Sequence, residues 1–260
     1  MNIYRDTPCW DGVKTAALGY TSDADRIRAA MNELRAEGFE AVVGPMEGST
    51  WSAHRLVTES DGRPPFLMEP VNPPGAVEAF ESAGLAVVSR YVSAERPVDA
   101  APGGAPAASG LALRNIDLAR AEEELAAIHA LSLEAFSRNR YYAPISREAF
   151  VASYKPVLPA VDPALVFLAE DAAGALKGFL FAIPDFNEGA RPESVILKTY
   201  ASTVKGCGSM LANAFHARAQ EKSYRRVIHA LMHEDNLSVR HSERTGGAVF
   251  RRYALWGARL

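Results

Sequence analysis

Apolar residues recur along this chain with two different periods, and these periods predict alternating strands and helices. Four apolar residues lie three or four positions apart and so share one face of a helix: Ile27, Ala30, Met31 and Leu34. We expect Ser22 or Asp23 to cap this helix. Short apolar runs bounded by glycine, such as residues 85–92, are typical of buried strands. The pattern indicates an α/β fold with a mixed sheet.

The same reasoning gives a full set of expected elements. The predicted strands are 13–20, 39–43, 66–68, 85–92, 111–116, 164–170, 176–183, a strand beginning at 194, 227–232 and 249–256. The predicted helices are 22–37, a helix from 73 to 84, 117–136, a helix beginning at 146, a helix ending near 222, and a short helix before Gly246.

The stretch from Ser194 to Phe215 combines a buried strand, a loop with two glycines and the beginning of a helix. The first backbone N–H groups of a helix have no partner within it, and together with the helix dipole they suit a phosphate or pyrophosphate. Gly206 and Gly208 let the backbone approach such an anion without an intervening Cβ. The sequence therefore predicts a phosphorylated cofactor at this loop.

Residues 95–109 are rich in proline, glycine and alanine and poor in large apolar residues, which is typical of a linker. We predict an N-terminal part over residues 1–95, a linker over 96–109 and a C-terminal domain over 110–260. The second half of each part has the same order of strand, helix, strand, helix and strand. The closing strands share a dipeptide, Arg90-Tyr91 and Arg252-Tyr253. We interpret this as an internal repeat, and chance similarity of two α/β halves is the alternative.

The order of elements over residues 111–260 resembles the GCN5-related N-acetyltransferase (GNAT) superfamily. In that family a loop of the pattern Arg/Gln-x-x-Gly-x-Gly/Ala holds the pyrophosphate of acetyl-CoA, and residues 203–208 match it with Thr203 in the first place. A helix-capping turn without a ligand is the alternative. The resemblance implies acetyl-CoA as cofactor, bound by Tyr200, Ala201, Ser202, Thr203, Val204, Lys205, Gly206, Cys207, Gly208, Ser209 and Asn236. Cys207 is interpreted as a small filler of the loop rather than a nucleophile.

The N-terminal part resembles the second half of the same fold. Its equivalent of the loop, residues 20–25, has no glycine pair and carries Asp23 and Asp25, which would repel a pyrophosphate. We therefore predict a tandem GNAT-like protein whose truncated, degenerate N-terminal copy does not bind CoA. This copy is expected to pack against the C-terminal domain or to shape the acceptor cleft, with Trp51, His54 and Arg55 reaching that cleft.

Acetyl transfer to an amine needs a base for the ammonium and an acid for the leaving thiolate. Glu193 and Glu234 are the candidate bases and His233 a third, with solvated surface acids as the alternative for the two glutamates. The family often uses a tyrosine on its last helix as acid, and no tyrosine occurs between Asn236 and Gly247. Tyr253 is the candidate replacement, and a core tyrosine is the alternative.

Four residues follow the first helix of the C-terminal domain, where the resemblance places part of the acceptor site: Arg138, Arg140, Tyr141 and Tyr142. Two arginines suit an acceptor that carries a carboxylate or a phosphate. A solvated loop is the alternative.

Composition narrows the class of partner. A hydrophobic fraction of 48% and a charged fraction of 23% are those of a globular protein, and the net charge of −3 gives no general attraction to nucleic acid or anionic membranes. Two cysteines are too few for a disulfide framework or a zinc site, so no metal is expected. With no bilayer-crossing run or signal-peptide pattern, we predict a cytoplasmic protein. The exposed strand edge of the truncated copy predicts a homodimer.

Three functions remain open on these grounds. The first is an acetyl-CoA-dependent N-acetyltransferase acting on a primary amine of a small molecule. The second is a catalytically inactive CoA-binding or regulatory protein, which the missing tyrosine and Thr203 suggest. The third is an interaction protein that uses the fold as a scaffold without a cofactor.

Overall fold

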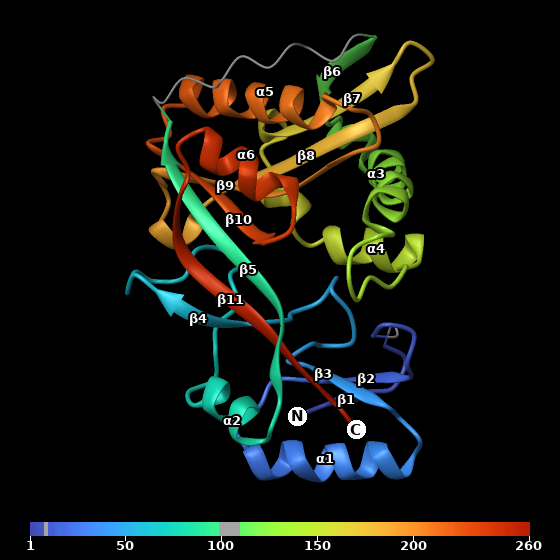
Figure 1. The fold of residues 1–260 in the computed structure, drawn as a ribbon. Helices are drawn as coiled ribbons and strands as arrows, with labels where there is room; N and C mark the ends of the chain where they lie inside the picture. The colour runs from blue at the N-terminus through green and yellow to red at the C-terminus, as the bar shows by residue number, and fades with distance from the viewer. Residues whose placement is uncertain (8–9, 99–109) are drawn as a thin grey trace.

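The computed structural model describes residues 1–7, 10–98 and 110–260, and one sheet of eleven strands runs through it (Figure 1). The strand order is β1-β2-β3-β11-β5-β10-β9-β8-β7-β6, and β4 pairs with β11 beside this path. The strands are β1 (Ile3–Tyr4), β2 (Thr15–Leu18), β3 (Ala41–Gly44), β4 (Leu56–Ser60), β5 (Ala86–Pro97), β6 (Leu111–Asn115), β7 (Val166–Asp171), β8 (Leu176–Pro184), β9 (Ser194–Ser202), β10 (Arg226–His233) and β11 (Ala248–Arg259). The helices are α1 (Ala24–Ala36), α2 (Ala76–Ser82), α3 (Ala121–Phe136), α4 (Arg147–Tyr154), α5 (Cys207–Glu221) and α6 (Leu237–Arg244). The predicted mixed α/β fold is confirmed.

The N-terminal half packs α1 and α2 against strands β2, β3 and β11. The Asp23 carboxylate caps α1 by accepting from the backbone N–H of Arg26 at 3.0 Å, and Ile27 and Leu34 of this helix are fully buried. The predicted strand at 66–68 is wrong, because side chains satisfy its amides. The N–H of Leu67 donates to the Asp185 carboxylate at 2.8 Å, so a turn forms in place of a ladder. Two strands that the pattern did not indicate, β1 and β4, are present.

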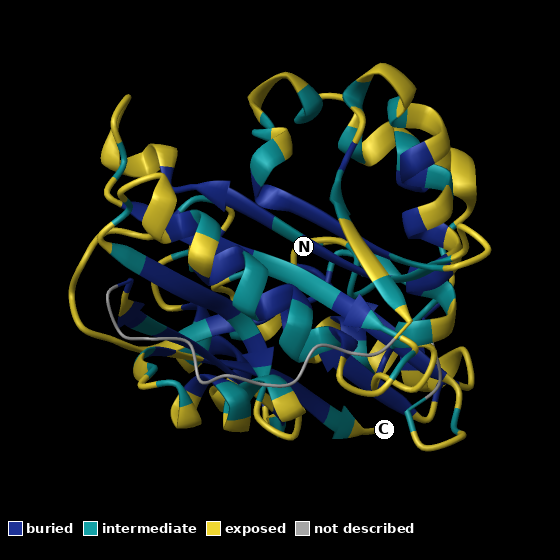
Figure 2. Ribbon diagram, turned by 90° about the horizontal axis from the view of Figure 1, so that it is seen from above, coloured by how far each residue is buried: buried dark blue, intermediate teal, exposed yellow. Residues whose placement is uncertain are grey.

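The C-terminal half places helices on both faces of strands β7, β8 and β9. One core cluster joins α5 to the face that carries Leu180 and Val195, and another joins α3 and α4 to the face that carries Leu168 and Phe179. Figure 2 shows the result: the strands are buried, and the outward faces of the helices are exposed. Two layers of helix thus hold β9 rigidly on both sides.

The last strand of each half crosses into the other half. Strand β5, from the N-terminal half, lies between β10 and β11, and β11, from the C-terminal half, lies between β3 and β5 (Figure 1). The shared dipeptides meet at the centre of this arrangement, because Tyr253 is the register partner of Tyr91. In the order β3-β11-β5-β10, strands from the N-terminal half (β3, β5) alternate with strands from the C-terminal half (β11, β10). Reading the order backwards gives the same alternation with the two halves interchanged. Segments 1–95 and 110–260 contribute to one sheet.

Strand β5 also bears on the predicted linker. It extends through Pro97, two residues into the predicted segment 96–109, and its end pairs with Arg226 of β10. Residues 99–109 of that segment lie outside the described residues.

Candidate functional site

A gap between β9 and β10 opens a large cavity. The two strands pair in parallel from Ser194 with Arg226 to Leu197 with His229, and then they separate. Irregularities on both strands lie at this point: an extra residue, Lys198, in the pairing of β9 with β8, and a register shift around Leu231, whose φ is +56°. A bulge breaks the ladder and bends its strand. The cavity has a volume of about 1260 Å³, and both halves of the chain line it.

The predicted cofactor residues divide between the cavity wall and the loop beyond it. Tyr200, Ala201, Ser202 and Asn236 line the cavity. The others follow as a loop and the first turn of α5: Thr203, Val204, Lys205, Gly206, Cys207, Gly208 and Ser209. They are contiguous with the wall but do not line it, and their role in binding stays a prediction.

The start of α5 has the local geometry that an anion site needs. Gly206 caps the helix with φ of +86°, a conformation that favours glycine, and it has no side chain to occupy the first amides. A Cβ at Gly208 would lie 3.3 Å from the ring of Tyr200. Cys207 is fully buried, and burial raises the pKa of its thiol, which fits the interpretation of this residue as a filler.

The N-terminal half builds one wall of the cavity. Trp51, His54 and Arg55 line it, and that this cavity is the predicted acceptor cleft stays a prediction. The indole Nε1 of Trp51 donates to the carbonyl oxygen of Ala143 at 2.8 Å, and its ring meets that of Phe150 edge-on at 5.7 Å. This tryptophan therefore fixes the loop after α3 against the N-terminal half.

Three of the four predicted acceptor residues line the cavity, namely Arg138, Arg140 and Tyr142. Arg140 donates to the carbonyl oxygen of Val88 at 3.0 Å, so this side chain spans from the loop to β5. Tyr141 does not line the cavity and is corrected here. Its φ is +59°, and its buried ring packs with Tyr91 and Tyr253 in a core cluster.

Glu193, Glu234 and Tyr253 do not line the cavity, and their predicted part in proton transfer stays a prediction. Glu193 is exposed at the beginning of β9 and lies 3.3 Å from the guanidinium of Arg225. Glu234 lies 3.4 Å from that of Arg252. Tyr253 is buried, with its hydroxyl bonded to Glu69 and 3.0 Å from the Ser93 hydroxyl. Burial raises the pKa of Tyr253, and the core-tyrosine alternative fits it.

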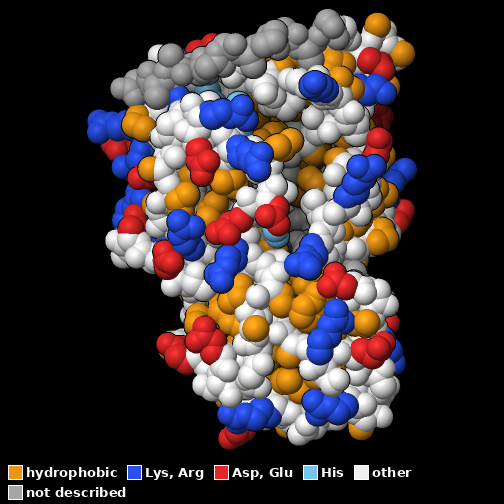
Figure 3. All heavy atoms as spheres, in the orientation of Figure 1, with side chains coloured by type: hydrophobic (Ala, Val, Ile, Leu, Met, Phe, Trp, Pro, Cys, Tyr) orange, Lys and Arg blue, Asp and Glu red, His pale blue; other side chains and the backbone are white. Residues whose placement is uncertain are grey.

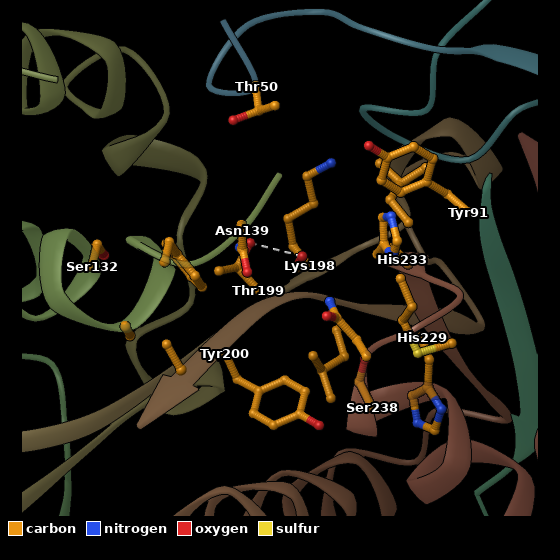
Figure 4. A pocket seen from close by; sticks show the side chains of 18 of the residues that line it. Thr50, Tyr91, Ser132, Asn139, Lys198, Thr199, Tyr200, His229, His233 and Ser238 are labelled. Carbon is orange, nitrogen blue, oxygen red and sulfur yellow. Dashed lines mark hydrogen bonds between the residues drawn. The ribbon is translucent and has the colours of Figure 1, made fainter. Parts of the chain in front are cut away.

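His233 differs from these three, because it lines the cavity and is half-buried. Its ring meets the ring of Tyr91 edge-on at 5.0 Å, and Figure 4 shows the two side chains together at one side of the site. Burial lowers the pKa of His233, so the ring is neutral at pH 7.

Two cavity residues carry positive charge in an enclosed place. Lys198 is half-buried, and its Nζ donates to the carbonyl oxygen of Met68 at 3.4 Å. Burial, aided by the nearby guanidinium of Arg55, lowers the pKa of Lys198 to about 8. Arg55 is only 7% exposed, donates to the carbonyl oxygen of Leu231 at 3.1 Å and lies 3.9 Å from the centre of the Tyr91 ring.

Sequence reasoning missed Lys198. The available signal was a lysine directly after the apolar run of residues 195–197, because a charge inside a buried strand needs a reason. Among the described residues, no helix is both long and apolar enough to cross a membrane.

Comparison with known proteins identifies the fold. Neither a protein-family model nor a curated protein matches the sequence. Among solved structures, the chain is similar to a GCN5-related N-acetyltransferase from Sphaerobacter thermophilus, with a TM-score of 0.57 and 16% identity over 84% of this chain and 59% of the other. It is also similar to a tandem GNAT protein from the clavulanic acid biosynthesis pathway, with a TM-score of 0.52 and 17% identity over 97% of this chain and 77% of the other.

A third similar structure is a GCN5-related N-acetyltransferase from Anabaena variabilis, with a TM-score of 0.55 and 12% identity over 98% of this chain and 58% of the other. The chain thus spans less than two thirds of the length of the Sphaerobacter and Anabaena proteins. At these identities the likeness concerns the fold, and the chain has the fold of the GNAT N-acetyltransferases.

Proposed function

We propose that this chain, with its GNAT fold, is an N-acetyltransferase that transfers an acetyl group from acetyl-CoA to a primary amine of a small-molecule acceptor. The observation that carries the proposal is the separation of β9 from β10 beyond Leu197 and His229, which opens a cavity that runs to the strand end before α5. The amides at the start of α5, with Gly206 as cap, would hold the pyrophosphate. Tyr200, Ala201, Ser202 and Asn236 would line the arm of the cofactor.

Acetyl-CoA would supply the acyl group as a thioester, and the chain would bring an unprotonated amine to it. The positive charges of Arg55 and Lys198 disfavour another cation in the cavity, so they lower the pKa of a bound ammonium group. His233 is the one of the three predicted bases that lines the cavity, and it or a water molecule would take the proton. No carboxylate base is then required.

The N-terminal half would be a degenerate GNAT-like copy that does not bind CoA. The first helix of this half begins at the Asp23 carboxylate, which already accepts from the N–H of Arg26. The equivalent place at α5 has Gly206 and no such carboxylate. The N-terminal half would instead complete the acceptor side of the cavity through Trp51 and Arg55.

Calorimetric titration with acetyl-CoA tests the proposal. The wild-type protein is expected to bind, and Gly206→Glu is expected to weaken binding at least tenfold, because the new carboxylate occupies the amides and repels the phosphates. Gly84→Glu is the matched control, since Gly84 also has a positive φ (+90°) and has open space around its Cβ position. No binding of millimolar acetyl-CoA by the wild-type protein would contradict the proposal.

A catalytically inactive CoA-binding or regulatory protein is the second candidate. It is favoured by α6, which has no tyrosine, and by the position of Glu193 and Glu234 outside the cavity. A thiol-release assay over a panel of amines separates the two candidates. Turnover that falls in His233→Gln supports the enzyme, whereas acetyl-CoA binding without turnover on any amine supports the regulatory protein.

A further inference from the structure

Arg55 and Lys198 line one cavity, and neither forms an ion pair with a carboxylate of the described chain. Arg55 is almost completely buried: its Nη1 donates to the carbonyl oxygen of Leu231 and its Nη2 contacts the Nε2 of His54, but both partners are uncharged and its Nε has no hydrogen-bond partner. A buried cation is usually paired, because an unpaired one loses its hydration without compensation. The arrangement therefore points to a negative charge that comes from outside the chain.

The two carboxylates of the cavity wall form no ion pair with Arg55 or Lys198, although Glu69 lies near enough to act against the burial that lowers the pKa of Lys198. Two residues of the wall are acidic, Glu69 and Asp235. Glu69 is held by Arg251, at 2.9 Å, and by the hydroxyl of Tyr253. The side chain of Asp235 is 94% exposed. The cavity near Arg55 and Lys198 is thus positive.

This positive place is separate from the predicted pyrophosphate site. Lys198 lies four residues before the end of β9 at Ser202, roughly 13 Å along the strand at the usual rise per residue. Its side chain extends toward Thr50 of the N-terminal half, whereas Tyr200 extends the opposite way, toward Ser238 of α6 (Figure 4). The two cations therefore face the acceptor side of the cavity.

We propose that Arg55 and Lys198 bind an acid group, a carboxylate or a phosphate, of the amine acceptor. The inference rests on the proposed function in that the ligand is called an acceptor. Arg138 and Arg140 lie on the wall of the same cavity and add to the field that attracts an anion. The acceptor is therefore an amino acid or an amino phosphate rather than a simple amine.

Direct binding of product-like probes tests this without the cofactor. N-acetyl amino acids are titrated by calorimetry against the matching N-acetyl amino acid amides, and O-phosphoethanolamine is titrated against ethanolamine. At least one acid is expected to bind at least tenfold more tightly than its uncharged or non-phosphorylated partner. A preference among the N-acetyl amino acids indicates a carboxylate site, and a preference for O-phosphoethanolamine indicates a phosphate site. No preference for the acid in either series overturns the inference.

Variants assign the preference to the two cations. Lys198→Met is expected to abolish most of the preference for the acid, and Arg55→Lys, which keeps the charge, to retain it. Lys155→Met is the matched control, because Lys155 pairs with Glu122 on an exposed surface away from the cavity. Circular dichroism reports whether each variant folds. A preference that survives in a folded Lys198→Met protein and in a folded Arg55→Gln protein overturns the assignment.

A second readout distinguishes charge pairing from a change of shape. The pKa of Lys198 is about 8, and a bound anion raises it, so binding at pH 8 takes up a fraction of a proton. Calorimetry in two buffers of different ionisation enthalpy measures this uptake, which should vanish in Lys198→Met.

The outcome also separates this inference from the proposed function. If the protein prefers acids but does not bind acetyl-CoA, the anion site is supported and the proposed acetyltransferase function is contradicted. If the protein binds acetyl-CoA and acetylates amines that carry no acid group, without any preference for acids, the proposed enzyme is supported and the anion site is contradicted.

Discussion

Tyr253 shows how burial decides the role of a single side chain. Its hydroxyl joins Glu69 to Ser93 within the core, and Glu69 in turn holds Arg251 at 2.9 Å. These contacts bring β5 and β11 together with the segment before α2. From these contacts we expect the residue to act in stability rather than in proton transfer.

Tyr253→Phe should accordingly lower stability and leave turnover unchanged. The variant removes a buried hydrogen bond to a carboxylate, which costs about 1–3 kcal/mol in the free energy of unfolding. Urea unfolding and the thiol-release assay measure the two effects side by side. A loss of turnover with an unchanged free energy of unfolding would instead indicate that Tyr253 takes part in proton transfer.

For single residues, the sequence predicted which backbone segments lie at the site better than it predicted which side chains face the cavity. It indicated the loop at Gly206 and the cavity wall at Tyr200, because backbone positions follow from the order of elements. It did not indicate that Glu193 is exposed and pairs with Arg225, since a residue at a strand end faces solvent or cavity according to how the strands diverge. It could not identify Lys198 because an extra residue in β9 changes which side chains face the gap.

At the scale of elements, a buried pair of histidines joins α5, β10 and α6. His229 of β10 lies with its Nδ1 2.7 Å from the hydroxyl of Ser242 on α6, and its Nε2 3.3 Å from the Nε2 of His216 on α5. Both histidines are buried. Burial lowers the pKa of His229 to about 3 and that of His216 to about 4.

The protein should therefore lose stability as the pH falls below 6.5. In the unfolded chain both histidines take up protons near pH 6.5, whereas in the folded chain they stay neutral until about pH 4 and 3, so acid favours unfolding. Each contributes a loss of about 2 kcal/mol between pH 6.5 and 5. Urea unfolding at pH 7, 6 and 5 measures this slope.

His229→Gln isolates the contribution of one histidine. The variant should flatten the slope by about one proton between pH 6.5 and 5. A slope that is unchanged in His229→Gln would show that other groups cause the acid sensitivity.

Elements with a regular period were predictable, and those fixed by distant side chains were not. The face of α1 with Ile27 and Leu34 follows from spacing alone. The turn at 66–68 depends on Asp185, more than a hundred residues away, whose carboxylate accepts from Leu67. An apolar run of three residues carries no information about such a partner.

At the scale of the whole molecule, the crossed strands β5 and β11 make the two halves one folding unit. Each half depends on the other for the strand that continues its sheet, because β10 pairs with β5 and β3 pairs with β11. The element order indicated a repeat, with the shared dipeptides Arg90-Tyr91 and Arg252-Tyr253, and this repeat stays a prediction. It did not predict that β5 and β11 cross into the other half, since a strand has the same apolar pattern whether it pairs within its own half or with the other half.

Residues 110–260 expressed alone should therefore be insoluble, because β10 loses one of its two neighbours and β11 loses all three strands that pair with it. Co-expression with residues 1–98 should restore a soluble complex. Solubility and analytical size exclusion of the separate and combined pieces measure this. A soluble, cooperatively unfolding 110–260 fragment would contradict it.

The symmetry around Tyr91 and Tyr253 has a consequence for assembly. Two separate chains that exchanged their last strands in this way would form a dimer, and its population would depend on protein concentration. In this chain the two partners are covalently joined, so the same contact forms at a fixed effective concentration. The part of the cavity wall built by Trp51 and Arg55 is therefore present however dilute the protein becomes.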